Sequence, residues 1–477
     1  MPPYVRPAPP SAEWMPAAEL QGDYFAMNAG KIFLGNTKDG RKIGIEDNRH
    51  IMTIAGSRAG KSATSLMSNL LTWTGSVMAI DPKGELATNT AGIRANMGQD
   101  VYILDPFGEV KDEEARKYRV RFDPLTEIKA GAQDDMIDNA AMIAEALIIP
   151  ASGAANDHWS LAAKNLLRGL ILYALHREEA HGMPASLNDV RTWVTSPVGD
   201  GDEEDNGKIW LSTIFDLMMD VETFGGAIAG VGGTMKGKPA GERGSIISTA
   251  VEQTSFLDSV PMKDHLSSSD MPTLRLLKRK PTTIYLVLPA SRLATHFRWL
   301  RMILTLALSA LESEPNREEM PPVLFILEEF PQLGYMRQIE AAAGLMAGYQ
   351  VKLWTVIQDL SQIKALYRGS WETFIGNAGI VEAFGNTDGT TLEYLSKRLG
   401  MTLAEQAQPN SLSLDAQRGG QSPERETIVT VPLMATHEIA LAFARKNMNK
   451  LVMVAGEKPF TLRRVFWKDL IDEWKSA

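Results

Sequence analysis

The chain of 477 residues has a hydrophobic content of 44 %, no cysteine and a net charge of −9. Its length predicts two or three domains, and the lack of cysteine excludes disulfides and thiolate metal sites and suits a reducing compartment. The negative net charge argues against indiscriminate nucleic-acid binding. It does not exclude a ring-shaped assembly with a basic inner surface, because the location of the charges matters more than their sum.

The first predicted elements are a proline-rich arm and a hairpin. Residues 1–22 open with MPPYVRPAPPSAEW, lack the apolar core of a secretory signal and are predicted to be a disordered arm. Residues 30–47 predict a hairpin with Asp39-Gly40 at its turn. Strand patterns within 51–55, 76–85 and 100–107 then alternate with helical patterns. This alternation predicts a parallel sheet with helices on its faces.

A glycine-rich segment, AGSRAGKS at residues 55–62, lies between the first of these strands and a helix. It is the phosphate-loop pattern with alanine for the first glycine, placed where unpaired N–H groups and the helix dipole favour an anion. Lys61 is expected to reach the β- and γ-phosphates of ATP, and Ser62 to place its hydroxyl on Mg²⁺. The alternative is a turn that binds nothing. The residues expected to contact the nucleotide are Gly56, Ser57, Arg58, Ala59, Gly60, Lys61, Ser62 and Ala63.

The alternation stops after about residue 130, and most segments up to about 280 have helical patterns. In the longest, Trp159, Leu166, Leu170 and Ala174 share one apolar stripe. The glycine-rich residues 225–245 are predicted to be flexible. Strand patterns return at 282–290, 323–330, 351–358 and 379–386.

Two carboxylates, Glu328 and Glu329, follow the buried strand VLFIL. Ligands bind at the carboxyl ends of the strands in an open parallel sheet. Glu328 is therefore expected to hold Mg²⁺ through water, and Glu329 to orient and polarise the attacking water. Gln358 ends the next strand, where RecA-like motor ATPases place an amide that contacts the γ-phosphate and the water. The alternative for each is a solvated strand end.

The predicted fold is therefore α/β: a RecA-like parallel-sheet P-loop ATPase domain with an inserted all-α domain. The ATPase domain is expected at 23–130 and 281–477, and the inserted domain at 131–280. Residues 405–427 are poor in apolar side chains and are predicted to be a loop or disordered.

Several of these motifs together resemble one family. GSRAGKSA, DPKGEL, RFDPL, TIYLVLPA, FILEEFPQLG and VIQDLSQIKALYRGSW occur in order between about residues 40 and 470. The chain resembles the type IV secretion coupling proteins, the TraG/TraD-like conjugative DNA-transfer ATPases. This resemblance implies a homo-hexameric ring at the cytoplasmic face of the bacterial inner membrane, which passes relaxase-bound single-stranded DNA or secreted protein substrates to a type IV secretion channel. It also implies that the inserted helical domain recognises substrates.

Three departures from the family pattern carry expectations of their own. No apolar run reaches the ~18–20 residues that span a bilayer, so a separate membrane anchor or a truncated chain is expected. The usual Asp-Glu pair is Glu328-Glu329. The segment before the strand that ends at Gln358 lacks the arginine that relatives often carry there. The arginine finger, which contacts the nucleotide bound by a neighbouring subunit, then has four candidates: Arg49, Arg337, Arg368 and Arg398.

Three functions follow from this sequence. The first is an ATP-driven translocase for conjugative DNA. The second is an adaptor that binds ATP and recruits relaxase or effectors, with weak turnover. The third is another RecA-like translocase of the FtsK/HerA kind. Contact with nucleic acid has no clear signal, because each candidate lining charge, at Arg58, Lys83 and Arg94, is on its own better explained as a solvated surface charge.

Overall fold

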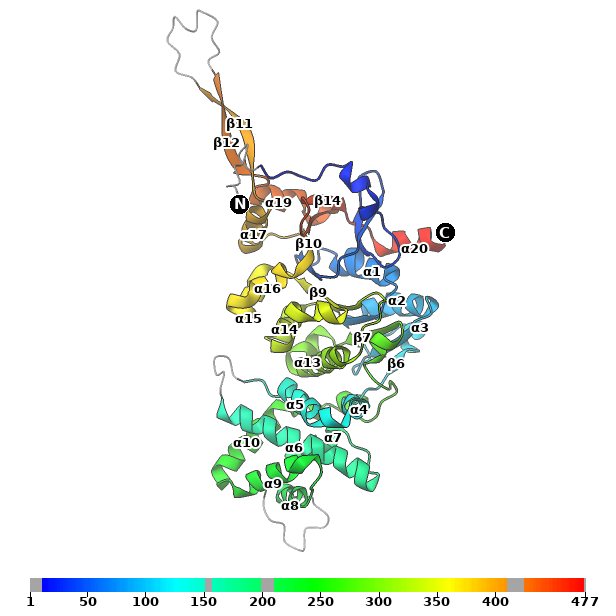
Figure 1. Ribbon diagram of the computed structural model, residues 1–477, viewed down its shortest axis with the longest axis vertical. Helices are drawn as coiled ribbons and strands as arrows, with labels where there is room; N and C mark the ends of the chain where they lie inside the picture. The colour runs from blue at the N-terminus through cyan, green and yellow to red at the C-terminus, as the bar shows by residue number, and fades with distance from the viewer. Residues whose placement is uncertain (1–10, 151–156, 199–209, 410–423, 476–477) are drawn as a thin grey trace, which may run out of the picture. The chain divides into compact units, whose positions relative to one another are not determined.

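The computed structural model describes residues 11–150, 157–198, 210–409 and 424–475 (Figure 1). The chain divides into two compact units, one formed by Met1–Thr72 with Thr355–Ala477 and the other by Trp73–Trp354. The boundary falls within strand β9 (Val351–Ile357).

The first unit is built on a mixed sheet in the order β2-β1-β14-β13-β10-β3-β9. Strands β10 and β3 pair in parallel, and the pairs from β10 out to β2 are antiparallel. Every residue of β3 and β10 is buried, as their apolar composition predicts. The strands are β1 (Ile32–Asn36), β2 (Lys42–Ile45), β3 (His50–Ala55), β10 (Ala378–Phe384), β13 (Asn449–Val454) and β14 (Phe460–Arg463).

Helices and a separate hairpin complete the first unit. The strands β11 (Met401–Pro409) and β12 (Glu424–Pro432) form a two-stranded antiparallel ladder. The helical elements are η1 (Glu19–Gln21), η2 (Asp23–Phe25), η3 (Ser62–Leu66), α1 (Met67–Thr72), α15 (Leu360–Tyr367), η9 (Arg368–Ser370), α16 (Trp371–Gly376), α17 (Gly389–Leu399), α19 (Thr436–Ala442), η10 (Arg445–Asn447) and α20 (Trp467–Lys475).

The second unit contains strands in the order β9-β8-β4-β7-β5-β6, and the pairs from β8 to β6 are parallel. Its strands are β4 (Val77–Asp81), β5 (Asp100–Leu104), β6 (Arg119–Val120), β7 (Thr282–Val287) and β8 (Val323–Leu327). Helix α2 (Glu85–Asn96) packs on β4, β5 and β7. The other helical elements outside residues 121–281 are α3 (Glu113–Arg116), α13 (Ala290–Ser313), η7 (Phe330–Leu333), α14 (Arg337–Leu345) and η8 (Met346–Tyr349).

Between β6 and β7, the described residues form helices and no strand, and Figure 1 shows α6, α8, α9 and α10 gathered together. Asp157 caps α6 by accepting a hydrogen bond from Trp159 N, and Gly182, at φ +66°, ends it. The elements are α4 (Leu125–Ala130), η4 (Gln133–Asp135), α5 (Met136–Leu147), α6 (His158–His181), α7 (Leu187–Val194), α8 (Leu211–Met219), η5 (Phe224–Gly226), α9 (Ala227–Gly237), α10 (Ala240–Gln253), η6 (Ser255–Asp258), α11 (Val260–His265) and α12 (Leu276–Arg279).

The α/β prediction, the hairpin with Gly40 at its turn (φ +91°) and the predicted strands are confirmed. The expected domain bounds stay a prediction, because the two compact units divide the chain differently. On the stripe of α6, Leu166, Leu170 and Ala174 are buried, whereas Trp159 is 39 % exposed.

The prediction of a flexible segment over 225–245 is wrong, because this segment contains α9 and the beginning of α10. The glycines there allow close helix packing: a Cβ on Gly232 would lie 2.7 Å from the carbonyl oxygen of Phe215. On α6, which also packs against α9, a Cβ on Gly169 would lie 2.6 Å from Val231. Close packing therefore compensates for the low helix propensity of glycine.

Two predicted disordered segments are partly ordered. In residues 405–427, Glu405–Pro409 and Glu424–Thr427 pair in the β11–β12 ladder, and 410–423 lie outside the described residues. In the predicted arm, residues 11–22 are ordered, because Met15 N donates to Pro459 O (2.9 Å) and Leu20 is buried in η1. Residues 1–10 lie outside the described residues. Backbone hydrogen bonds, which side-chain composition does not report, order both segments.

Candidate nucleotide-binding site

The phosphate loop leaves the end of β3 and turns back against the end of β10. Gly56 N donates to Phe384 O (3.3 Å), and Ala59 N donates to Gly56 O (3.1 Å). A Cβ on Gly56 would lie 2.1 Å from the carbonyl oxygen of Gly385, so only glycine fits. Gly60, at φ +93°, supplies the left-handed turn before the helix.

The helix after the loop begins as π-helix η3 and continues as α1. Thr64 closes its first turn, since its N and Oγ1 both donate to Gly60 O, at 3.0 and 2.8 Å. Lys61 is 7 % exposed, Ser62 and Ala63 are half-buried, and Ser57 and Arg58 are exposed. Single turns of π-helix recur at functional sites.

The donors of the loop fit a nucleotide polyphosphate. The first N–H groups of a helix have no helical partner and attract anions. Lys61 and Ser62 lie at the start of this helix. The ammonium of Lys61 can neutralise phosphate charge, and the hydroxyl of Ser62 can ligate a hard cation. The loop therefore has the donor set that ATP with Mg²⁺ requires.

A buried ion pair lies between β3, β10, β13 and η3. Lys450 Nζ donates to Glu382 Oε2 and to Ser65 Oγ (3.4 Å), and Thr53 Oγ1 donates to Glu382 Oε1 (2.7 Å). All four residues are at most 1 % exposed. Thr53 precedes the phosphate loop and Ser65 follows it, so the ion pair fixes the two elements that hold the loop.

Arg464 braces the same loop and escaped the sequence prediction. Its Nη1 donates to Ala59 O, its Nη2 donates to Arg445 O (2.7 Å), and its guanidinium lies 4.6 Å from the centre of the Phe384 ring. Burial lowers the pKa of this guanidinium. The one signal in the sequence was an arginine pair directly after a strand-like FTL segment, which is too common to single out.

Gln358 lies in the same unit as the loop, where it directly follows β9 and is half-buried. Its carbonyl oxygen accepts a hydrogen bond from Asn386 Nδ2 (3.3 Å). Because Asn386 follows Gly385, which contacts Gly56, one short turn after β10 contacts both Gln358 and the phosphate loop.

Glu328 and Glu329 belong to the other unit, where they follow β8 and are half-buried. Glu329 adopts φ +54°, a left-handed conformation that is costly for a residue with a Cβ and that is enriched at functional sites. The turn is held from α13, because Arg301 Nη1 donates to Leu333 O (2.9 Å) and Tyr335 O (2.7 Å).

Asp81 is a third carboxylate at a strand end of this unit's sheet, on the strand that neighbours β8, and sequence reasoning gave it no role. It ends β4, which pairs with β8, and its Oδ2 accepts from Ala87 N (2.8 Å). Burial, with a smaller contribution from the charge of Glu328, raises the pKa of Asp81 to about 7. Within the described residues, no group of three or more histidine or acidic side chains is placed to hold a metal ion.

The arginine candidates lie in different surroundings. Arg49 is ion-paired with Asp47 (2.6 Å), and Arg398 Nη1 donates to Tyr394 Oη (2.9 Å) within α17. Arg337 and Arg368 are exposed at the starts of α14 and η9.

Among the candidate lining charges, Arg58 and Lys83 are exposed, but Arg94 is fully buried. Arg94 donates to Thr283 Oγ1 (2.8 Å) and Gly75 O (2.7 Å), and burial lowers its pKa to about 10. It is therefore a structural group, and the expectation of a solvated or lining charge is wrong for this residue.

The family described as type IV secretory system conjugative DNA transfer matches residues 13–473. The chain belongs to this family. Conjugal transfer protein TraG of Escherichia coli is 26 % identical over 449 residues, which are 91 % of this chain and 68 % of TraG. A second E. coli TraG is 26 % identical over 377 residues, 76 % of this chain and 57 % of that protein. VirD4 of Agrobacterium fabrum (strain C58) is 26 % identical over 461 residues, 94 % of this chain and 62 % of VirD4. The chain thus spans between 57 and 68 % of the length of these relatives.

Solved structures show the same fold. The bacterial conjugative coupling protein TrwBdeltaN70 in complex with sulphate has a TM-score of 0.66 at 14 % identity, over 96 % of each chain. TrwB in complex with ADP and Mg²⁺ has a TM-score of 0.64 at 14 % identity, over 96 % of this chain and 95 % of TrwB. The RecA-like P-loop fold is therefore confirmed. Over the described residues, the structure has no helix of sufficient length and apolarity to cross a bilayer.

Proposed function

We propose that this chain is an ATP-dependent coupling protein that recruits relaxase-bound single-stranded DNA or protein substrates to a type IV secretion channel and helps to translocate them. The observation that carries the proposal is a phosphate loop, closed by Gly56 and Gly60, within a family match that runs from residue 13 to 473.

In this proposal the loop residues 56–63 bind ATP. Their backbone N–H groups surround the phosphates, Lys61 neutralises the β- and γ-phosphates, and Ser62 ligates Mg²⁺. Two observations support this assignment: the donors fit a polyphosphate, and the related coupling protein TrwB forms complexes with ADP and Mg²⁺ and with a non-hydrolysable ATP analogue.

ATP hydrolysis needs groups beyond the loop. We assign to Glu328 a water-mediated hold on Mg²⁺, to Glu329 the orientation and polarisation of the attacking water, and to Gln358 contact with the γ-phosphate. The left-handed backbone of Glu329 supports its assignment, because such strain is retained where a side chain must be aimed. The short turn that contacts both Gln358 and the loop supports the third assignment.

We further propose that the active form is a homo-hexamer at the cytoplasmic face of the bacterial inner membrane, docked on channel components. The transferring phosphoryl group spreads negative charge that one loop does not fully neutralise, and an arginine from a neighbour accelerates such reactions by ~10³–10⁵ in GTPases. The helical residues 131–280 are proposed to recognise substrates.

Two substitutions test the chemistry. Lys61→Ala should abolish nucleotide binding or turnover, because it removes the one side-chain cation of the loop helix start. Glu329→Gln should keep ATP bound and trap it, because the amide keeps the size of the side chain but cannot polarise water. Binding of a fluorescent ATP analogue and phosphate release are measured for both. A Glu329→Gln protein that hydrolyses ATP as fast as the parent would show that the water-activating group lies elsewhere.

A further inference from the structure

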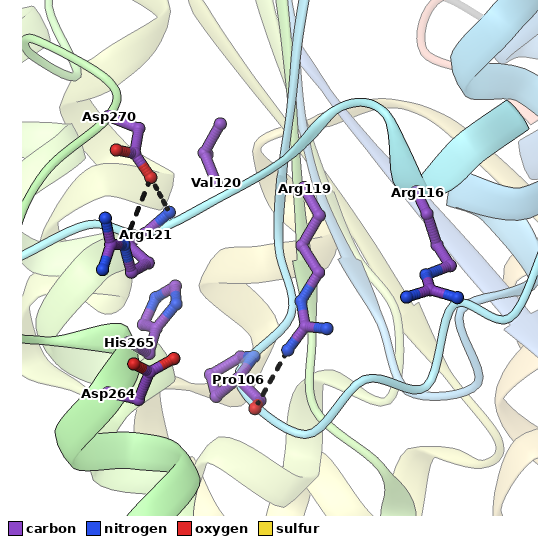
Figure 2. Close-up of a pocket in the computed structure, with 8 residues that line it drawn as sticks. All are labelled: Pro106, Arg116, Arg119, Val120, Arg121, Asp264, His265 and Asp270. Carbon is purple, nitrogen blue, oxygen red and sulfur yellow. Dashed lines mark hydrogen bonds and ion pairs between the residues drawn. The ribbon is translucent and has the colours of Figure 1, made fainter. Parts of the chain in front are cut away.

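A polar pocket lies at the edge strand β6 of the second unit, and none of its lining residues is among those assigned to the nucleotide. It has a volume of about 340 Å³, at the lower end of the range for pockets that hold small ligands. Eight residues line it: Pro106, Arg116, Arg119, Val120, Arg121, Asp264, His265 and Asp270 (Figure 2). We call it the arginine pocket.

Cations outnumber anions in the arginine pocket. Three guanidinium groups face two carboxylates, and one carboxylate is already used, since Asp270 Oδ2 accepts from Arg121 N (3.0 Å) and Arg121 Nε (3.4 Å). Arg119 is anchored by a hydrogen bond from Nη2 to Pro106 O (3.3 Å), which leaves its other N–H groups for further acceptors. Arg116 and Arg119 are both exposed, so a solute can reach them.

The floor of the pocket is a buried histidine with an unused polar atom. His265, at the end of α11, is 3 % exposed, and its Nε2 has no hydrogen-bond partner. Burial and the charges of Arg119 and Arg121 lower the pKa of His265 to about 3, so the ring is neutral at pH 7. In the tautomer with the proton on Nε2, this atom is a donor that a bound oxyanion would satisfy.

The lining selects the chemical class of the ligand. Arginine forks match the oxygens of phosphate in pairs. Apart from His265, the lining residues include no aromatic ring on which a base could stack, so the pocket is suited to the phosphate and not to the base. Contacts of this kind position a nucleic-acid backbone without reading its sequence.

We propose that the arginine pocket binds a phosphate group, held by Arg116 and Arg119 at its mouth and by His265 Nε2 at its floor. The phosphate is either part of a single-stranded nucleic-acid backbone or free in solution as inorganic phosphate. In the first case the pocket contributes to the DNA binding that the proposed function requires. In the second case it is a separate anion-binding site.

The test compares Arg116→Gln/Arg119→Gln with Lys117→Gln in the full chain. Lys117 is an exposed cation of the same segment that pairs with Glu114 (2.5 Å) and does not line the pocket. Both proteins also carry Lys61→Ala, so a failure of the proposed ATP site affects them equally and leaves the comparison intact. Inorganic phosphate is titrated by calorimetry, and a fluorescent oligothymidine by anisotropy at several salt concentrations.

The double variant should bind its ligand about tenfold more weakly than Lys117→Gln, as expected for two lost charge-assisted contacts. If the source is DNA, the oligothymidine shows the loss and its salt slope falls by at least ~0.7, the value for one phosphate contact on a single strand. If the source is free phosphate, only the calorimetric titration shows the loss.

Equal affinity of both proteins for both probes would overturn the proposal. So would a loss confined to polyglutamate, a probe for acidic peptides, since the pocket would then serve carboxylates. The single variant Arg116→Gln replaces the double one if thermal unfolding shows that the latter is not folded. In addition, His265→Phe, which keeps a ring of similar size but removes Nε2, should weaken phosphate binding severalfold, and unchanged affinity would contradict the role of the floor.

Discussion

Removing one partner of the buried ion pair between Lys450 and Glu382 should strongly destabilise the unit that carries the phosphate loop. Lys450→Met keeps the length and apolar stem of the side chain but leaves Glu382 as an uncompensated charge with 1 % exposure. Breaking one side of such a pair costs about 3–5 kcal/mol, mainly because the remaining charge stays buried without its partner.

Calorimetric unfolding measures this loss. In domains of ~150–250 residues, 1 kcal/mol corresponds to about 2–4 °C, so Lys450→Met should lower the melting temperature of this unit by about 6–20 °C. The matched control is Lys458→Met, the same substitution at an exposed lysine paired with Glu13 (3.1 Å), which should leave the melting temperature unchanged.

The double variant Lys450→Met/Glu382→Gln should recover most of the lost stability, because neither buried charge remains. If Lys450→Met melts at the same temperature as the parent and Lys458→Met, the charge left on Glu382 carries no cost and the reasoning is refuted. A double variant no more stable than Lys450→Met would show that the loss comes from packing and not from charge.

Three further outcomes follow from the structure. Arg464→Ala should raise the dissociation constant for ATP severalfold, as Ala59 O loses its donor, whereas unchanged affinity in equilibrium titration would remove Arg464 from the site. Burial raises the pKa of Asp81 to about 7, so the parent loses unfolding free energy as the pH rises from the unfolded pKa of this carboxyl to about 7. The free energy of unfolding of Asp81→Asn, measured in urea, should therefore rise by about 2–3 kcal/mol relative to the parent between pH 5 and pH 8. A difference between the two proteins that does not change with pH would contradict this. Gly169→Ala should destabilise the helical segment, while Gly230→Ala, where a Cβ meets no atom within 4 Å, should stabilise it by about 0.5–1 kcal/mol; the same sign for both would show that the close packing is not limiting.

Local patterns predicted the strands and the phosphate loop because their signals are contained in short segments. Continuous apolar runs gave β3, β8 and β9, and glycine spacing with Lys61 gave the loop. The brace from Arg464 to Ala59 could not be read in this way, because its partners lie 405 residues apart and meet only in the folded sheet.

The same limit explains the segments that were misread. Residues 225–245 contain many glycines, which predict flexibility by propensity, but at Gly232 helix α9 packs so closely on α8 that a Cβ would lie 2.7 Å from Phe215 O. Arg94 looked like a surface charge because nothing nearby in the sequence shows that its guanidinium would reach the carbonyl groups before β4. In each case a tertiary contact overrides the local preference.

The central proposal is that ATP turnover is coupled to DNA. The most direct measurement is the ATPase rate per subunit against protein concentration, with and without single-stranded DNA, at two salt concentrations. The proposed translocase predicts a rate that is slow in dilute protein, rises with concentration as subunits complete each other's sites, and rises further with DNA, less so at high salt because phosphate contacts release counterions. A rate that is flat with concentration and indifferent to DNA would contradict the translocase and favour a nucleotide-binding recruitment adaptor.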